Sequence, residues 1–422
     1  MTFIFKNYAF NAETNVASFH YGDSQGRVYA ERFLFPRSIP TYNQAVFERA
    51  LFLSFLLIGA SYYKCFPTTD ILFETGGVDE WQATFLNHVY QEGLSQYAYE
   101  NDLTRADLAQ FTSVAGADAR GAIDYEGSGT LSLQSGGKDS LLLASLLEKK
   151  NHPYTAWYVS SSDSYPKVLD SLNSELLVAK RSIDTPALLE AAKQGGKNGH
   201  VPVTFIVLSY AVMQAVLLNK QTVLAAIAHE GDEPHGWIGD LPINHQWSKT
   251  WQAETLFAEY VRRYISPNLR VGSPLRAMSE LKITQLFAEH SWHRFADEFS
   301  SCNVANYKQG ANNQTLSWCG LCPKCANAYL LFAPFTTKDE LDQRLGGDLF
   351  SRSELLDTFK GLLGVDGVMK PFECVGEIEE LRAAYHTAQQ NGYSSLPFEV
   401  PVSNFPIDET YPSQDWATAM VQ

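Results

Sequence analysis

The chain has 422 residues, and domains of about 150 residues each would give two or three of them. A hydrophobic fraction of 45% and a charged fraction of 19% are ordinary for a globular protein and exclude a disordered one. The net charge of −15 argues against a protein that holds a nucleic-acid backbone through its overall field. Six cysteines are too few and too unevenly spaced for a disulfide scaffold of this size.

Two features bear on localisation. Residues 1–6 lack the basic start and apolar core of a signal peptide. The most apolar stretch, residues 50–60, is shorter than the roughly 20 residues that cross a bilayer, and polar residues bound it on both sides. We therefore expect a cytoplasmic protein with no membrane span, and a buried helix at 50–60.

The first predicted unit is an N-terminal α+β domain over residues 1–125. Its opening part, residues 3–35, alternates in hydrophobicity as antiparallel strands do. Asp79 is a residue type that caps helix N-termini. The remaining predicted elements are a helix over about 42–60, a strand at 71–73, a helix from 79 to about 99, and a Gly/Ala/Asp-rich linker at 115–121.

The second unit, residues 126–300, predicts an α/β fold, in which a parallel sheet is flanked by helices. Strands that alternate with helices are typical of such sheets, whose ligands bind at the carboxyl ends of the strands. The third unit, residues 301–422, predicts a mostly helical C-terminal region with a cysteine-rich loop. The elements predicted for the second unit are strand 130–134, helix 139–150, strands 154–159 and 176–183, helix 203–219 and strand 222–228.

A glycine turn between strand 130–134 and the next helix is the strongest motif. Two glycines let the backbone approach an anion closely, and a helix N-terminus offers unpaired N–H groups. The turn is not a Walker A loop, because Ser132 and Asp139 stand where that motif has Gly and Ser or Thr. We favour a nucleotide-phosphate loop over a plain strand-to-helix turn. Its residues are Ser135, Gly136, Gly137, Lys138, Asp139 and Ser140.

A cysteine cluster falls within 24 positions and comprises Cys302, Cys319, Cys322 and Cys325. Four thiolates at this spacing fit a closed tetrahedral Zn²⁺ site with a structural role. An iron–sulfur cluster accepts the same four ligands, and four metal-free thiols are the plain alternative. We expect zinc. Cys65 follows an apolar helix and is expected to be a core thiol.

Two polar segments accompany the predicted sheet. Asn198 and His200 precede the helix at 203–219 and are candidates for facing a nucleotide or substrate. His229 and Glu230 follow strand 222–228, where a parallel sheet places reactive groups. The plain alternatives are a solvated helix entry for the first segment and a capped loop for the second.

Further candidates lie beyond the sheet. His245 and Lys249 belong to a dense polar run, and Arg276 to a basic stretch that could receive phosphates or carboxylates. Cys374 and Glu377 lie in a segment that combines charge, Pro and Gly. The alternatives here are a solvated helix face for Arg276 and a helix entry for Glu377.

Six segments together resemble the ATP-dependent UDP-N-acetylmuramoyl-L-alanyl-L-glutamate epimerases of bacterial peptidoglycan synthesis. The glycine turn alone resembles only the wider PP-loop ATP-pyrophosphatase superfamily, and the other five segments carry the family. The similarity spans nearly the whole chain. The segments are Gly-Gly-Lys-Asp-Ser (136–140), Asn-Gly-His-Val-Pro-Val-Thr (198–204), Asn-His-Gln-Trp-Ser-Lys (244–249), Ser-Glu-Leu (279–281), Trp-Cys-Gly-Leu-Cys-Pro-Lys-Cys (318–325) and Lys-Pro-Phe-Glu-Cys-Val-Gly-Glu (370–377).

This resemblance implies that UDP-MurNAc-L-Ala-L-Glu is converted to its D-Glu epimer, with ATP and Mg²⁺ consumed or bound and AMP and pyrophosphate released. It implies an adenine nucleotide alpha hydrolase-like fold and no nucleic-acid or membrane partner. The implied phosphate ligands are Ser135, Gly136, Gly137 and Ser140, with Asp139 on Mg²⁺ and Lys138 as an auxiliary positive charge. The candidate proton carriers are His229, Glu230, His245, Cys374 and Glu377, and the candidate substrate ligands are Asn198, His200, Lys249 and Arg276.

The chemistry explains why such a loop would serve an epimerase. A Cα proton beside a carboxylate is weakly acidic, because its loss would add a second negative charge. Adenylation of the carboxylate removes the first charge and makes the carbonyl an electron sink, so a base and an acid on opposite faces can exchange the proton. Closure of the activated acid to an oxazolone is a further hypothesis.

Three alternatives stay open at this point. The first is a PP-loop zinc enzyme resembling 7-cyano-7-deazaguanine synthase, whose cysteine pattern is similar to residues 301–325. The second is a tRNA-modifying PP-loop ATPase, against which the acidic net charge counts. The third is a non-enzymatic nucleotide-sensing or zinc-stabilised module, which would bind ATP without releasing pyrophosphate.

Overall fold

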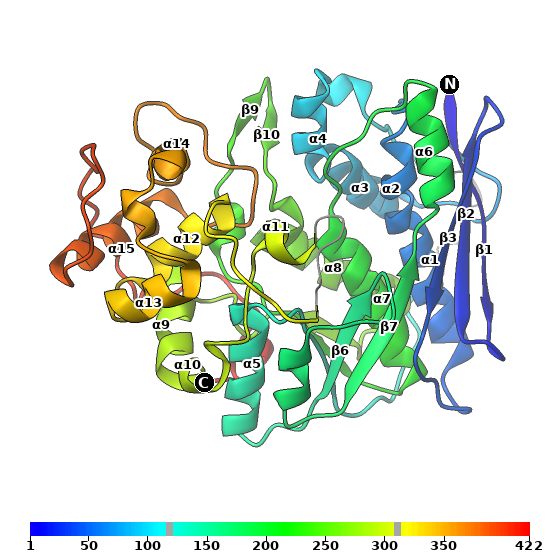
Figure 1. Cartoon of the computed structure of the whole chain (residues 1–422). Helices are drawn as coiled ribbons and strands as arrows, with labels where there is room; N and C mark the ends of the chain where they lie inside the picture. Colours follow the sequence, from blue (N-terminus) through cyan, green and yellow to red (C-terminus); the bar gives the residue numbers. More distant parts are fainter. Residues whose placement is uncertain (115–120, 308–313) are drawn as a thin grey trace.

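The computed structural model, which describes residues 1–114, 121–307 and 314–422, contains a nine-stranded sheet whose N-terminal strands reach one edge of the molecule (Figure 1). The five strands of its first half are mutually parallel, and β3, β2 and β1 continue the sheet in antiparallel fashion before β4 pairs parallel to β1. In order across the sheet the strands are β11 (Arg270–Gly272), β8 (Thr222–Leu224), β5 (Thr130–Leu133), β6 (Thr155–Ser160), β7 (Leu176–Ser182), β3 (Val28–Leu34), β2 (Val16–Asp23), β1 (Thr2–Asn11) and β4 (Asp70–Phe73).

The parallel half confirms the predicted α/β architecture, with two corrections. Strand β8 ends at Leu224, not at residue 228, so His229 lies five residues beyond the end of the strand. Strand β11 was not predicted, because three residues are too short to show a periodicity. The predicted N-terminal strands pair with β7 through β3, from Arg32 opposite Ser182 to Leu34 opposite Lys180. One sheet therefore runs through the first two predicted units.

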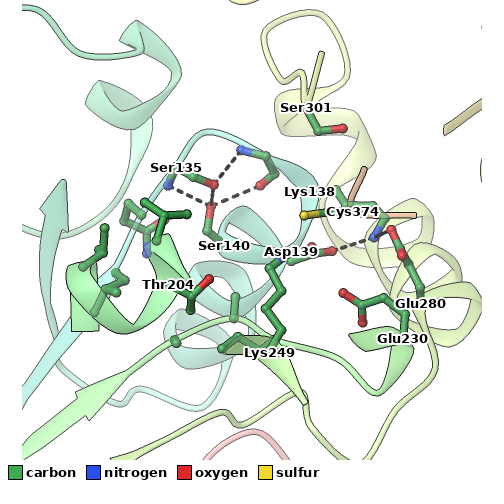
Figure 2. Close-up of a pocket in the computed structure, with 18 of the residues that line it drawn as sticks. Ser135, Lys138, Asp139, Ser140, Thr204, Glu230, Lys249, Glu280, Ser301 and Cys374 are labelled. Carbon is green, nitrogen blue, oxygen red and sulfur yellow. Dashed lines mark hydrogen bonds and ion pairs between the residues drawn. The ribbon is translucent and has the colours of Figure 1, made fainter. Parts of the chain in front are cut away.

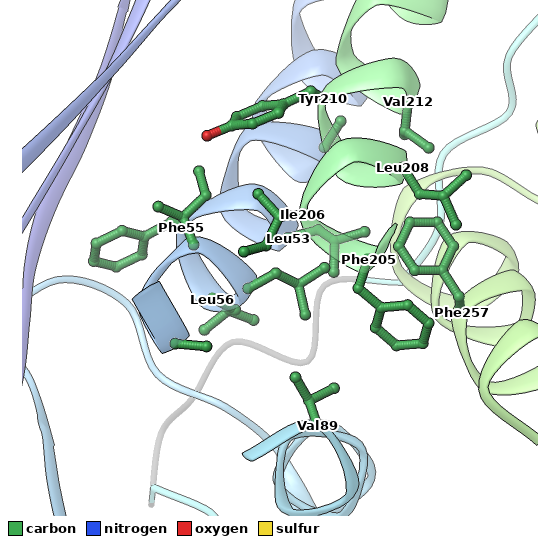
Figure 3. Close-up of a cluster of buried hydrophobic side chains, with 14 of the residues drawn as sticks. Leu53, Phe55, Leu56, Val89, Phe205, Ile206, Leu208, Tyr210, Val212 and Phe257 are labelled. Atoms are coloured by element: carbon green, nitrogen blue, oxygen red, sulfur yellow. The ribbon is translucent and has the colours of Figure 1, made fainter. Parts of the chain in front are cut away.

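Two long apolar helices, α1 (Gln44–Ile58) and α7 (Val203–Leu217), pack against each other in the main core (Figure 3). Asn43 begins α1, since its side chain accepts a hydrogen bond from the Val46 amide. Helix α7 is apolar on all sides and almost wholly buried, which is typical of a helix enclosed by other elements. Phe205 and Phe257 bring α7 into contact with α8 (Trp251–Tyr260).

The predicted buried helix is confirmed but is longer than residues 50–60. Helices α1 and α2 (Ala60–Tyr63) form a run of 20 residues, Gln44–Tyr63, with a mean hydropathy of 1.5. That length and composition would suffice for a membrane span, yet 78% of its apolar window is buried inside the protein. The run packs against β1, β2 and α7, so it is a core helix here.

The helix predicted from Asp79 to residue 99 is split into three parts. They are α3 (Glu80–Asn87), a π-helical turn at His88–Glu92 and α4 (Ser95–Glu100). Asp79 is the N-cap as predicted, and it shares a reciprocal capping box with Gln82. At Gly93, a Cβ would lie 3.0 Å from the Trp247 ring and 3.2 Å from Pro202. The break therefore allows the segment that carries Trp247 to approach closely.

The C-terminal region is mostly helical, as predicted, and lies at the end of the molecule opposite the N-terminal strands (Figure 1). It shares a second hydrophobic core with α5 (Lys138–Lys149). Helix α6 (Thr185–Lys193) and the hairpin β9 (Gly236–Ile238)–β10 (Leu241–Ile243) were not predicted. The predicted linker lies, except for Gly121, outside the described residues. The helices of the region include α12 (Pro323–Phe332), α13 (Lys338–Leu345), α14 (Leu356–Leu362) and α15 (Ile378–Gln390). Helix α9 (Glu280–His290), from the second predicted unit, packs against α12 and α15.

A buried ion pair joins the antiparallel and parallel halves of the sheet. Glu31 on β3 is fully buried and accepts hydrogen bonds from Arg181 on β7 at 2.7 and 3.2 Å. The hydroxyls of Tyr62 and Tyr210 donate to the same carboxylate. Each oxygen of the Glu31 carboxylate thus accepts two hydrogen bonds. A carboxylate can be buried without a large loss of stability only when it is paired and hydrogen-bonded in this way.

We expect Glu31→Ala to lower the free energy of unfolding by about 3–5 kcal/mol, because it leaves the Arg181 charge buried and unpaired. The matched control is Glu175→Ala, which removes the roughly half-exposed partner of Arg37 and should cost less than about 1 kcal/mol. Urea unfolding followed by circular dichroism measures both. Equal costs for the two variants would contradict the role given to Glu31.

Candidate active site

A cavity of about 310 Å³ lies at the carboxyl ends of β5, β6 and β8, where a parallel sheet binds its ligands (Figure 2). One wall is the glycine turn, and another is the start of α7 with Val203 and Thr204. The C-terminal region closes the cavity with Lys324, Asn327 and Cys374. Segments far apart in the sequence therefore meet at one site.

The glycine turn has the predicted strand–turn–helix context, between β5 and α5. Gly136 has φ +81°, and a Cβ on it would lie 2.7 Å from Leu316 Cδ1, so both backbone and space require glycine. The Ser140 hydroxyl accepts from the Ser135 amide at 3.2 Å and donates to the Gly137 carbonyl at 3.1 Å. The two serines thus fix the turn beside the N-terminus of α5, an arrangement suited to anions. Phosphate binding itself stays a prediction.

Lys138 does not face the turn as a free cation. Its buried ammonium lies 2.6 Å from Asp139 Oδ1 and 3.0 Å from Glu280 Oε1 (Figure 2). Burial alone would lower the pKa of Lys138, but the two carboxylates raise it above its ordinary value. The charge predicted as an auxiliary for phosphate is therefore already balanced by Asp139 and Glu280.

A second set of titratable side chains lines the cavity and comprises Lys249, Cys374 and Glu230 (Figure 2). Burial would raise the pKa of the Cys374 thiol, but Lys249 and then Lys324 outweigh it and lower that pKa below its usual range. Burial, followed by the nearby Glu280, raises the pKa of Glu230 to about 7. At neutral pH the thiol is thus drawn toward its charged form and the carboxyl toward its neutral form.

The four clustered cysteines come together as the sequence predicts. Their sulfur atoms all lie within 4.8 Å of one another. The separations are 3.6 Å for Cys302–Cys322, 3.5 Å for Cys322–Cys325 and 3.8 Å for Cys319–Cys325. A tetrahedral zinc site with Zn–S bonds of about 2.3 Å needs sulfur atoms about 3.8 Å apart, so the donor set fits this ion.

This cysteine cluster is joined directly to the cavity. Asn303, next to Cys302, donates to Glu373 Oε2 at 2.7 Å, and Asn327 Oδ1 accepts from the Gly376 amide at 3.0 Å. These two bonds hold the segment 370–377 on either side of Cys374. Lys324, between two of the cluster cysteines, lines the cavity itself. The cluster is therefore an anchor for the part of the chain that presents Cys374.

His229 and Glu377, both predicted as proton carriers, lie beside the cavity and not on its wall. His229 Nδ1 is 3.2 Å from Asp232 Oδ2, and its Nε2 is 3.5 Å from Glu377 Oε1. The imidazole also stacks on Tyr411, with ring centroids 3.7 Å apart. Glu377 caps α15 in a capping box with Glu380. The arrangement connects the C-terminal tail with the segment after β8.

His200 and His245 lie together, with ring centroids 4.3 Å apart, and His235 adjoins them. Burial above all lowers their pKa values, to about 3 for His200, about 4 for His245 and about 3 for His235, so all three imidazoles are neutral at pH 7. Neither His200, predicted as a substrate ligand, nor His245, predicted as a proton carrier, is among the residues that line the cavity. Asn198 is exposed and does not line it.

Arg276 does not reach the cavity, in contrast to the substrate contact predicted for it. The side chain is fully buried and its Nε lies 2.9 Å from Glu254 Oε2. Its remaining nitrogens donate to the carbonyls of Ala228 at 2.6 Å and Lys249 at 2.7 Å. Because it holds the backbone of Lys249, Arg276 supports the wall of the cavity from behind.

Glu280, Lys324 and Asn327 line the cavity but were not among the predicted site residues. Glu280 lies in the segment 279–281 that carries part of the resemblance, and Lys324 lies inside the cysteine motif. Both residues could therefore have been predicted from these motifs. Asn327 had no signal, because a single amide on a helix with a buried face is unremarkable in sequence.

Two family models match this chain, and together they include the glycine turn and the cysteine cluster. A model described as MurL N-terminal domain matches residues 1–273, which include the sheet and the glycine turn. A model described as MurL C-terminal domain matches residues 298–398, which include the cysteine cluster and Cys374. The chain belongs to the MurL family. The MurL match includes the N-terminal strands, which favours this family over the alternatives left open by the sequence.

Three curated relatives carry the name UDP-N-acetyl-alpha-D-muramoyl-L-alanyl-L-glutamate epimerase. The protein from Xanthomonas oryzae pv. oryzae is 32% identical over 91% of this chain and 84% of its own length. The Micromonospora protein is 31% identical over 94% of this chain and 88% of its own. The Salinispora tropica protein is 32% identical over 99% of this chain and 90% of its own length. The likeness to MurL relatives thus extends along nearly the full chain.

Proposed function

We propose that the protein epimerises the terminal L-Glu of UDP-MurNAc-L-Ala-L-Glu to D-Glu in the cytoplasm, as a step in peptidoglycan precursor synthesis. Membership of the MurL family and the shared name of its relatives support an isomerase that acts on this small molecule. We further propose that ATP activates the substrate, with AMP and pyrophosphate as the by-products. The observation that carries this step is the serine-lined glycine turn at the N-terminus of α5, facing the cavity.

The cavity offers complementary surfaces for a nucleotide. Ser135, Gly137 and Ser140 present hydroxyl and amide groups at the helix N-terminus, which suits phosphate oxygens. Trp157, Val159 and Val207 give an apolar wall, which suits a nucleobase. Asp139 is the residue that would hold Mg²⁺, an ion that neutralises phosphate charge when bound. These features support ATP binding in a PP-loop manner.

The proposed chemistry requires that the α-carboxylate of glutamate replace pyrophosphate on the α-phosphorus. The resulting acyl-adenylate carries no negative charge on the carboxyl group, so the Cα proton becomes acidic enough for a side chain to remove. Water then splits the adenylate, giving AMP and the free acid. The titratable side chains on the cavity, Glu230, Lys249 and Cys374, support proton transfer at this place.

We also propose that Cys302, Cys319, Cys322 and Cys325 hold one Zn²⁺ with a structural role. The support is the fit of their sulfur separations to a tetrahedral ion and the absence of a disulfide among these free thiols. With all four positions taken by thiolates, such an ion has no open position for substrate. Its role would be to hold the anchor of the 370–377 segment together.

Asp139→Asn is expected to lower the release of AMP and pyrophosphate at least about 100-fold, because it removes the carboxylate that would hold Mg²⁺ beside the phosphates. A coupled pyrophosphate assay, run with and without UDP-MurNAc-L-Ala-L-Glu, measures this. The matched control is Asp297→Asn, which should retain full release, because the Asp297 side chain is 85% exposed and is not among the residues that line the cavity. Wild-type protein that binds ATP yet releases no pyrophosphate with this substrate would contradict the proposed function.

Purified protein is expected to contain one zinc ion per chain, measured by plasma mass spectrometry. Cys325→Ser should reduce the zinc content at least severalfold, because a neutral hydroxyl replaces a thiolate ligand. Cys65→Ser is the matched control, since this thiol lies in the other core and should leave the zinc content unchanged. Iron with acid-labile sulfide in place of zinc would show a cluster instead, and no metal in the wild-type protein would contradict the proposal.

A further inference from the structure

We infer that Cys374 and Glu230 are the two proton carriers of this site. In the L-to-D direction the Cys374 thiolate removes the Cα proton of the activated glutamate, and the Glu230 carboxylic acid returns a proton to the opposite face. The inference rests on the proposed function, since it requires an activated carboxyl group, and it deepens that function by giving each residue a role.

Cys374 has the position and environment of a base. All six cysteines are described, and Cys374 is the one that lines the cavity; Cys65 lies in the other core and the remaining four form the cysteine cluster. The ammonium groups of Lys249 and Lys324 line the same cavity as Cys374, and their positive charges favour its thiolate. The bonds of Asn303 and Asn327 to the flanking residues fix the backbone that carries the thiol.

Glu230 differs from the other carboxyl groups of the cavity. Asp139 and Glu280 are each paired with the Lys138 ammonium, whereas Glu230 Oε2 is buried without a hydrogen-bond partner among the described residues. A buried, unpaired carboxyl oxygen favours the protonated form, which can donate a hydrogen bond or a proton. Glu230 therefore begins the reaction in the state that an acid needs.

A two-base epimerisation requires the two groups to start in opposite protonation states, and the charges around Cys374 and the burial of Glu230 favour those states. The thiolate sulfur takes the proton and becomes a thiol, while the C–H electron pair moves into the carbonyl of the acyl-adenylate. That pair then returns to Cα and takes the proton of Glu230, which becomes a carboxylate. Lys249 lines the same cavity as both groups and balances the negative charge as it passes from Cys374 to Glu230. Exchange with water restores both states.

The experiment uses the L-Glu substrate with ATP and Mg²⁺ in heavy water. Wild-type protein should give D-Glu product with deuterium at Cα. Cys374→Ala should lower both deuterium uptake and epimerisation at least about 100-fold while AMP release continues, because the adenylate still forms and is hydrolysed. Glu230→Gln should lower epimerisation by a similar factor but still place deuterium at Cα of recovered L-Glu, since the thiol exchanges with solvent and returns its proton to the same face.

Should Cys374→Ala fail to fold, Cys374→Ser takes its place, because it nearly preserves the size of the side chain. The same loss is expected, since a serine hydroxyl is far too weakly acidic to be present as the anion that acts as the base. Glu354→Gln, at an exposed position, is the control for carboxyl removal and should behave as wild type. Deuterium uptake by folded Cys374 variants, or D-Glu formation by Glu230→Gln at the wild-type rate, would overturn the assignment. A wild-type protein that releases no AMP with this substrate would instead contradict the proposed function.

Discussion

The placement of buried charge at the carboxyl ends of the parallel strands is the constraint on which the site depends. A charge removed from water must be paired or change its protonation state. The Lys138 ammonium pairs with Asp139 and Glu280, and Arg276 pairs with Glu254. The positive charge of Lys249 favours the Cys374 thiolate. Among the carboxyl groups that line the cavity, Glu230 is the one with a buried oxygen that has no hydrogen-bond partner among the described residues, and burial raises its pKa.

The three parts of the chain contribute to this arrangement in different ways. The sheet places the glycine turn and Glu230, because both follow strands of its parallel half. The C-terminal region supplies Cys374, held in place by contacts with residues beside the cysteine cluster. The N-terminal strands extend the sheet through β3 and β7, and the buried Glu31–Arg181 pair secures that junction. A metal in the cysteine cluster would thus act on the reaction only by positioning.

Local motifs in the sequence predicted much of this, whereas long-range pairing could not be predicted. The glycine turn and the cysteine cluster were found because each is defined by neighbouring residues with a fixed spacing. Arg276 was misjudged because its partners, Glu254 and two distant carbonyls, are set by the tertiary fold. His229 was chosen for its place after a strand, but the strand ends five residues earlier and the ring turns toward Tyr411. A strand of three residues such as β11 is too short for an alternation of apolar and polar residues to be recognised in the sequence.

Carboxylate activation is the central claim, and oxygen transfer tests it most directly. The substrate is prepared with ¹⁸O in the α-carboxylate of its glutamate and incubated with the protein, ATP and Mg²⁺. Attack of that carboxylate on the α-phosphorus predicts ¹⁸O in the phosphate of AMP, detected by mass spectrometry. AMP without ¹⁸O, or ADP as the nucleotide product, would contradict the account.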